Sequence, residues 1–142
     1  MQATRAARTE GILPGGGVAL LNAQSAIDVT GLPPDEATGA EIVRRALEEP
    51  LRWIAGNAGF EPSVVVDRVR ALKPGEGLDA GSGAYCDLVE AGVIDPTMVT
   101  RSALQNAASI AKNILTTECV VAEIPDKEPM GMPGGGGMPD MM

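Results

Sequence analysis

The sequence predicts a mainly α-helical protein with a short β-hairpin and one C-terminal strand. Apolar residues make up 44% of the 142 positions, yet only Trp53, Phe60 and Tyr85 are aromatic. The core is therefore expected to be aliphatic and rich in alanine, which favours closely packed helices. Apolar residues recur at helical spacing in two long segments, 35–56 and 96–115, whereas strand-like runs are short.

The N-terminal part is expected to form two helices joined by a loop. Residues 1–10 are rich in Ala and Arg and are predicted as a helix that Gly11 ends. Residues 12–17 are predicted to be a loop, because a proline followed by three glycines sustains neither helix nor strand. A second helix is predicted over 18–26.

A long helix is predicted over 35–56 although Pro50 lies inside it. Because apolar residues keep helical spacing across the proline, we expect one kinked helix rather than two. Glu48 and Arg52 stand four residues apart in the favourable order, and such a pair contributes about 0.3–0.5 kcal/mol.

The next stretch mixes a helix with short extended pieces. A proline near its start favours a helix over 62–72, although the run 64–66 could equally be a strand by propensity. A turn then leads to an extended piece near Leu78. A short helix is predicted over 82–90, and a strand over 92–94 could pair with the piece near Leu78 as a hairpin.

The most regular element is predicted at 96–115. Asp95 is a candidate N-cap for this helix, and its apolar side chains cover two neighbouring faces, so we expect it to be central to the core. Residues 119–124 are predicted as a strand, and no partner strand of comparable length is visible in the sequence. Residues 126–142 are rich in Gly and Met and are expected to be a flexible tail.

Composition excludes several function classes. The net charge is −8 and no stripe of Lys or Arg offsets it, so no nucleic-acid partner is expected. No apolar run approaches the ~18 residues of a membrane span, and the N-terminus lacks the apolar region of a signal peptide. Cys86 and Cys119 form neither a disulfide framework nor a metal cluster, which indicates a cytoplasmic protein. Histidine is absent, so no Ser–His or Cys–His mechanism is available, and we predict no catalytic residue and no metal ligand in this chain.

Three loops could carry chemistry, and each also has a plain structural explanation. The glycines at 15–17 precede a helix N-terminus, where free amides suit an anion, but a simple turn would explain them as well. Asp95 could accept hydrogen bonds from a ribose or merely cap its helix. The turn of Asp79, Ala80 and Gly81 could flank a flat base or merely end a strand. Spacing alone does not decide between these alternatives.

Read together, four segments resemble the last quarter of the sequences of one family, the group I (GroEL-type) chaperonins. The residues in these segments are typical of bacterial members. The segments are ATRAARTEGILPGGGVALL, GFEPSVVVDRV, EAGVIDPTMVTRSALQNAASIAKNILTTECVVAEIP and the Gly/Met-rich terminus. The resemblance implies that residues 1–10 end an intermediate-domain helix. It also implies that 11–125 form the C-terminal half of an equatorial, ATP-binding domain, and that 126–142 are a flexible tail.

The resemblance also implies a function. Members of the family form stacked double rings that enclose non-native proteins and use ATP to switch between capture and release. By the family pattern, the backbone at Gly15 and Gly16 approaches the nucleotide. Of the remaining site residues, Asp79, Ala80 and Gly81 contact adenine, Val93 packs near the base and Asp95 holds the ribose. The family often has Asn and Ala at the places of Asp79 and Gly81, which puts the side-chain contact at Asp79 in doubt, because a carboxylate cannot donate a hydrogen bond.

Other parts of the family's machinery are expected outside this chain. They include the phosphate loop, the Mg²⁺ ligand, the strand that pairs with 119–124, and the apical domain that binds co-chaperonin and unfolded clients. The aspartate that positions the attacking water is expected just before Met1. We therefore predict that the chain alone does not hydrolyse ATP and acts with the rest of its subunit and with neighbouring subunits. The alternative is a catalytically silent module that docks onto chaperonin subunits through its unpaired strand.

Overall fold

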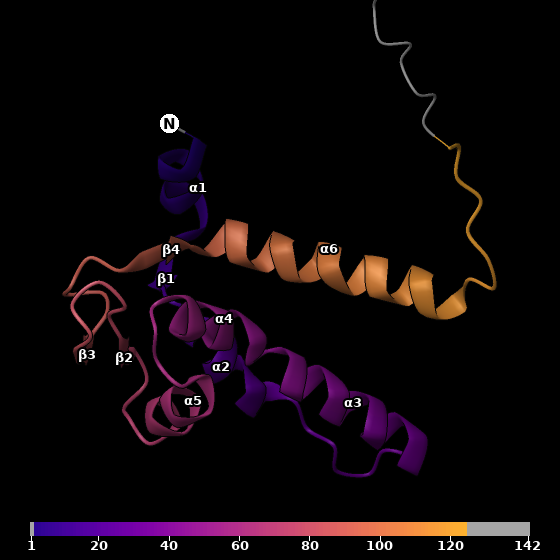
Figure 1. Cartoon of the computed structure of the whole chain (residues 1–142), viewed down its shortest axis with the longest axis horizontal. Coiled ribbons are helices and arrows are strands. Elements are labelled where there is room, and N and C mark those ends of the chain that lie inside the picture. The colour runs from indigo at the N-terminus through magenta and orange to yellow at the C-terminus, as the bar shows by residue number, and fades with distance from the viewer. Residues whose placement is uncertain (1, 125–142) are drawn as a thin grey trace, which may run out of the picture.

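The computed structural model describes residues 2–124 and contains six α-helices, one 3₁₀ turn and four short strands in that range (Figure 1). The predicted tail, 126–142, lies outside the described residues. In chain order the elements are α1 (Gln2–Glu10), β1 (Ile12–Pro14), α2 (Val18–Ala23), η1 (Gln24–Ala26), α3 (Pro34–Ala46), α4 (Glu49–Asn57), α5 (Pro62–Arg70), β2 (Glu76–Leu78), β3 (Tyr85–Asp87), β4 (Ile94–Pro96) and α6 (Thr97–Thr116).

The hydrophobic core lies between α2, α4, α5 and the β2–β3 hairpin, a group we call the packed lobe. Aliphatic side chains dominate it, as the composition predicts, and the half-buried Phe60 and Tyr85 pack against its edge. Its buried members are Val18, Leu21, Leu51, Ala55, Val65, Val66, Val69, Leu78 and Leu88. Figure 1 shows these elements grouped together below α6.

The strands form two separate antiparallel pairs, β1 with β4 and β2 with β3. Three sequence predictions are therefore wrong, although the extended piece near Leu78 is confirmed as β2. Residues 12–14 are not loop but a strand, because Leu13 finds a partner in Asp95 far along the chain. Residues 82–90 are not a helix, because Gly83 has φ +74° and the chain returns as β3 to pair with β2. The hairpin thus joins 76–78 to 85–87, and not to 92–94.

The segment 35–56 forms two helices and not one kinked helix. Pro50 has no N–H to donate to the carbonyl of residue 46, so the hydrogen-bonded ladder stops there and α4 begins afresh. The predicted pair of Glu48 with Arg52 is also wrong. Arg52 instead lies 3.6 Å from Glu49, while Glu48 turns toward Arg70.

The long helix α6 confirms the predicted 96–115 segment in extent but not in burial. The structure buries none of its residues, and Ile110, Ile114 and Leu115 are 61%, 67% and 85% exposed. Residues 119–124, predicted as a strand, have no regular structure here, since no strand of the described residues lies beside them to supply hydrogen bonds. No helix in residues 2–124 is long and apolar enough to cross a membrane.

The N-terminal helix α1 packs against the start of α6 and against β4 (Figure 1). Gly11 ends α1 with φ +84°, and its N–H donates to the carbonyl of Ala7, as the sequence predicts. Arg101 on α6 donates to both carboxylate oxygens of Glu10, at 2.6 and 3.2 Å. These hydrogen bonds, and the charge of Glu10, hold the pKa of Arg101 above its ordinary value.

Candidate functional site

The glycine loop between β1 and α2 touches the segment before β4. The Gly15 N–H donates to the carbonyl of Val93 at 2.8 Å. A Cβ atom at Gly15 would lie 3.1 Å from the carbonyl carbon and oxygen of Val93, so the two backbones meet with little room for a side chain. The structure therefore brings two residues of the predicted site into direct contact.

The other two glycines of the loop have left-handed backbones. Gly16 has φ +65° and Gly17 has φ +80°. A Cβ at Gly16 would lie 3.7 Å from the carbonyl oxygen of Leu78, the residue just before the Asp79 turn. A Cβ at Gly17 would come within 2.6 Å of the Leu51 backbone nitrogen, a distance that no real Cβ tolerates. The sequence prediction did not include Gly17 among the site residues, although its place in a run of three glycines was a signal.

The Asp79 turn is closed by hydrogen bonds of its own. The Asp79 carbonyl accepts from the Gly83 N–H at 2.8 Å, and the Asp79 N–H donates to the carbonyl of Ala84 at 2.9 Å. The Asp79 carboxylate accepts from the Ser82 hydroxyl at 2.5 Å and from the Gly81 N–H at 3.0 Å. Ser82 first, and then the Gly81 amide, hold the pKa of Asp79 below its ordinary value.

These bonds give the Asp79 side chain a role that the sequence did not indicate. Both of its oxygens already serve the turn, and so does the Gly81 N–H. Ser82 was missed as a supporting residue, and a serine three positions after an aspartate is the signal that could have found it.

Asp95 lies in β4, opposite Leu13 of β1. It is not the N-cap of α6, because strand pairing extends through Pro96, and Pro96 is the residue that precedes the helix. Asp95 is half-buried, and within residues 2–124 its carboxylate makes neither a hydrogen bond nor an ion pair. The carboxylate is therefore unused by the described part of the fold.

Taken together, the predicted site residues come from three segments that meet at the glycine loop. Gly15 touches Val93, Gly16 lies near the residue that precedes Asp79, and Asp95 follows Val93 by two positions in β4. The two hollows found among the described residues lie outside this group. One, of about 530 Å³, is on α1, and the other, of about 360 Å³, is between α2 and α6, and none of the seven predicted residues lines either. Among the described residues no group of three or more His, Cys, Asp or Glu side chains could hold a metal ion.

Comparison with known proteins finds one family for most of the chain. The model of the TCP-1/cpn60 chaperonin family matches residues 1–125. A group III chaperonin in the open state is 31% identical with a TM-score of 0.75, and the match covers 82% of this chain and 25% of that one. The open-state monomer of a group II chaperonin from Methanococcoides burtonii shares the fold, with 23% identity and a TM-score of 0.69, over 75% of this chain and 28% of that one. This chain thus spans about a quarter of the length of those structures.

Proposed function

This chain belongs to the TCP-1/cpn60 chaperonin family, and on that premise we propose that it contributes the nucleoside side of an ATP site in a ring-forming chaperonin. The mainly helical fold is the one expected for a fragment of the equatorial domain. The hydrogen bond between Gly15 and Val93 carries the proposal, because it joins two of the loops that the family pattern assigns to the nucleotide. The domain boundaries at residues 10 and 125 stay a prediction.

Each segment has a role that its chemistry allows. The backbone of Gly15 and Gly16 can approach a ligand closely because neither glycine carries a Cβ. Ala80 and Gly81 offer backbone groups to adenine, and Val93 supplies an apolar surface for its face. Asp95, with an unused and half-buried carboxylate, can accept hydrogen bonds from the ribose hydroxyls. The site ligand is ATP, with Mg²⁺ and the phosphates held by residues outside this chain.

The group assignment is part of the proposal. The phrases EGILPGGGVAL and IDPTMVTRSALQNAASIA favour a group I, bacterial chaperonin, whereas the two solved structures are of groups II and III and support the family alone. We further propose that the partners are the rest of the subunit and its neighbours in a double ring. Unfolded clients and a co-chaperonin would bind the apical domain of such a subunit, and not residues 1–142. The two free thiols fit a reducing cytoplasm.

Calorimetric titration of the 142-residue chain with adenosine, ADP and ATP tests this function. If only the nucleoside side is present, the three ligands bind with similar affinity, Mg²⁺ adds nothing and no phosphate is released. Asp95→Asn should weaken all three about tenfold or more, because a charge-assisted hydrogen bond to the ribose is lost. Glu36→Gln, which removes an exposed carboxylate on α3, is the matched control and should change nothing. Absence of saturable adenosine binding, or turnover that Asp95→Asn abolishes, would overturn the proposal.

One observation favours the alternative of a silent docking module. The whole of α6 and the segment 117–124 are without buried residues, and Val120, Val121 and Ile124 are each at least 85% exposed. Size-exclusion chromatography separates the two functions. Stable self-association that nucleotide does not change favours the silent module, whereas nucleotide binding by a monomer favours the ATP-site function.

A further inference from the structure

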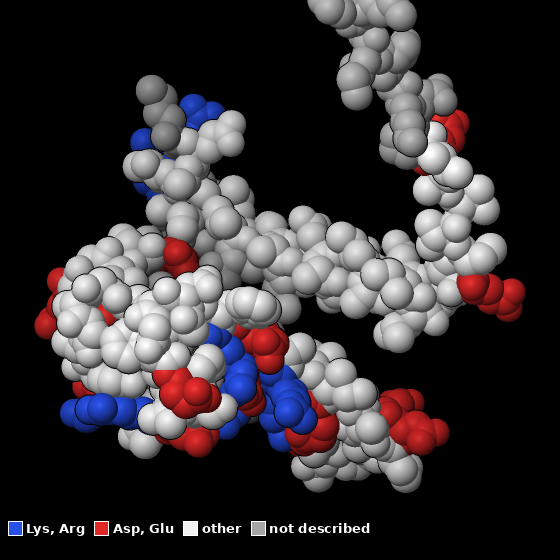
Figure 2. Space-filling model, in the orientation of Figure 1, with Lys and Arg blue, Asp and Glu red and all other residues white. Residues whose placement is uncertain are grey.

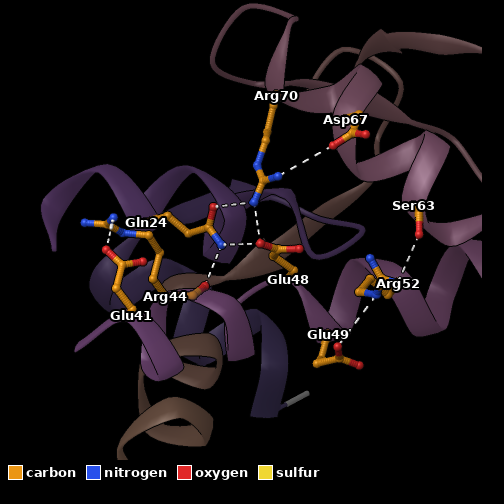
Figure 3. A network of polar contacts seen from close by, with 9 residues as sticks. All are labelled: Gln24, Glu41, Arg44, Glu48, Glu49, Arg52, Ser63, Asp67 and Arg70. Carbon is orange, nitrogen blue, oxygen red and sulfur yellow. Dashed lines mark hydrogen bonds and ion pairs between the residues drawn. The ribbon is translucent and has the colours of Figure 1, made fainter. Parts of the chain in front are cut away.

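A cluster of polar side chains joins α5, η1 and the junction between α3 and α4. We call it the Glu48 cluster. Figure 3 shows Arg70 of α5 reaching both Glu48 and Gln24, and Gln24 in turn reaching back to α3. Its contacts are the ion pair of Arg70 with Glu48, and the hydrogen bonds from Arg70 to Gln24 at 3.3 Å, from Gln24 to Glu48 at 3.3 Å and from Gln24 to the carbonyl of Arg44 at 2.5 Å.

Several features separate this cluster from an ordinary surface ion pair. Only 14% of the Glu48 side chain is exposed, so water screens the pair less than it screens the other ion pairs here. The Gln24 amide uses both its oxygen and its nitrogen within the cluster. Figure 2 shows the charged side chains gathered between α3 and α5, while the visible face of α6 is almost free of charge.

The cluster lies next to the place where α4 meets the glycine loop. Glu48 is the residue before α4, and Leu51 follows it in the first turn. The Leu51 backbone lies so close to Gly17 that a Cβ there would sit 2.6 Å away. A shift of the first turn of α4 toward α2 therefore collides with Gly17, and a shift away from α2 opens the loop. Gln24, at the other end of the same short helix α2, is held by the same carboxylate.

We infer that Glu48 is a positioning residue for the glycine loop. Its carboxylate ties the residue before α4 to Gln24 at the C-terminal end of α2, and the Leu51 backbone in the first turn of α4 lies against Gly17 at the N-terminal end. Together these contacts set where Gly15 and Gly16 lie relative to Val93. The positioning role of Glu48 does not depend on the proposed function. Only one consequence rests on that function, namely that nucleotide affinity depends on Glu48 although Glu48 does not touch the nucleotide. Neither the family match nor the sequence patterns assign Glu48 this role.

Amide hydrogen exchange of the full chain, followed by NMR, tests the position of the loop without any ligand. Glu48→Gln should speed exchange at the Gly15 and Val18 amides about tenfold, because these amides donate within the loop contact. Exchange at the Val65 amide, in the first turn of α5, should stay the same. Glu49→Gln is the matched control, since Glu49 is the adjacent carboxylate and lies outside the cluster, where it forms an ion pair with Arg52.

Two further measurements separate positioning from plain loss of stability. Arg70→Gln should reproduce the effect, and the double variant should be no worse than either single change, because both act through one contact. Adenosine affinity should fall about fivefold in Glu48→Gln and stay unchanged in Glu49→Gln. If exchange rises equally at Val65 and in the loop, or not at all in the loop, the inference is wrong. If the loop responds but the unaltered chain binds no adenosine, the positioning role stands and the proposed function fails.

Discussion

The packed lobe and α6 have similar apolar residues, but the lobe buries them and α6 leaves them exposed. The lobe buries nine aliphatic side chains with helices of six to nine residues, whereas α6, with 20 residues, buries none. Both have apolar side chains at helical spacing, so the spacing alone does not place a helix in the core. What differs is the neighbours. The lobe has elements on several sides, whereas among the described residues α6 contacts chiefly α1 and β4.

The largest expected effect tests how tightly the lobe is packed around the glycine loop. Gly17→Ala should lower the free energy of unfolding by about 4 kcal/mol, from left-handed strain together with overpacking against Leu51. Gly11→Ala has the same sign of φ but no atom within 4 Å, so it should cost only about 1 kcal/mol. Urea unfolding of both variants measures the difference. Equal losses of unfolding free energy in the two variants would show that the Leu51 backbone moves aside to accommodate the new methyl group.

The next test compares the two regions directly. Leu51→Ala removes a side chain that is 1% exposed and should cost about 3 kcal/mol, because a cavity is left in the lobe. Ile114→Ala removes one that is 67% exposed and should change stability by no more than about 0.5 kcal/mol. The same urea titration serves both. A large loss in Ile114→Ala would mean that α6 is covered in solution by a second copy or another partner.

A smaller effect is expected where α1 is tied to α6. Arg101→Gln should reduce stability only slightly, since half of the Arg101 side chain is exposed and salt screens the pair with Glu10. Its clearer signature is faster amide exchange in α1, with α5 unaffected. Arg5→Gln, an exposed arginine on α1, provides the comparison. If exchange in α1 does not change, packing rather than the ion pair holds the helix.

The smallest effect concerns acid and the Asp79 turn. Because the folded-state pKa of Asp79 lies below 3.8, its carboxylate stabilises the turn above pH 3.8, and this contribution is lost as the pH falls through the lower folded value. Protection of the Gly81 amide should therefore fall in strong acid. Asp79→Asn removes the titration, so the pH dependence of that protection should disappear. A pH profile that survives the substitution would point to another carboxylate.

The local elements could be predicted because their signals are local. Pro62 begins α5, Gly11 ends α1, and the apolar spacing of 96–115 marks α6 within a residue or two. Of the strands, β2 was predicted near Leu78 and β4 was placed two residues too early, whereas β1 and β3 were missed. Each strand has three residues, and its pairing is decided elsewhere in the chain. Nothing near Leu13 indicates that Asp95 will lie opposite it. The burial of α6 could not be predicted for the same reason, since burial depends on what lies beside a helix.

The candidate site shows the same division. The glycine loop and the Asp79 turn could be found by their residue types, and their assignment to a nucleotide came from family resemblance rather than spacing. That Gly15 touches Val93, and that Asp95 belongs to a strand and not to a helix cap, required the fold. Gly17 and Ser82 gave weak signals in the sequence and proved to hold the loop and the turn in place.

The pairing of β1 with β4 has a consequence for the order of assembly. Ile12 lies opposite Pro96, so most of the chain separates the two strands, and closing so long a loop carries an entropic cost before any contact forms. During synthesis the glycine loop leaves the ribosome before Val93 and Asp95 do, and it cannot meet them until the lobe has been made. The nucleoside side of the site is therefore expected to be among the last parts of this chain to form, after the helices of the lobe have packed.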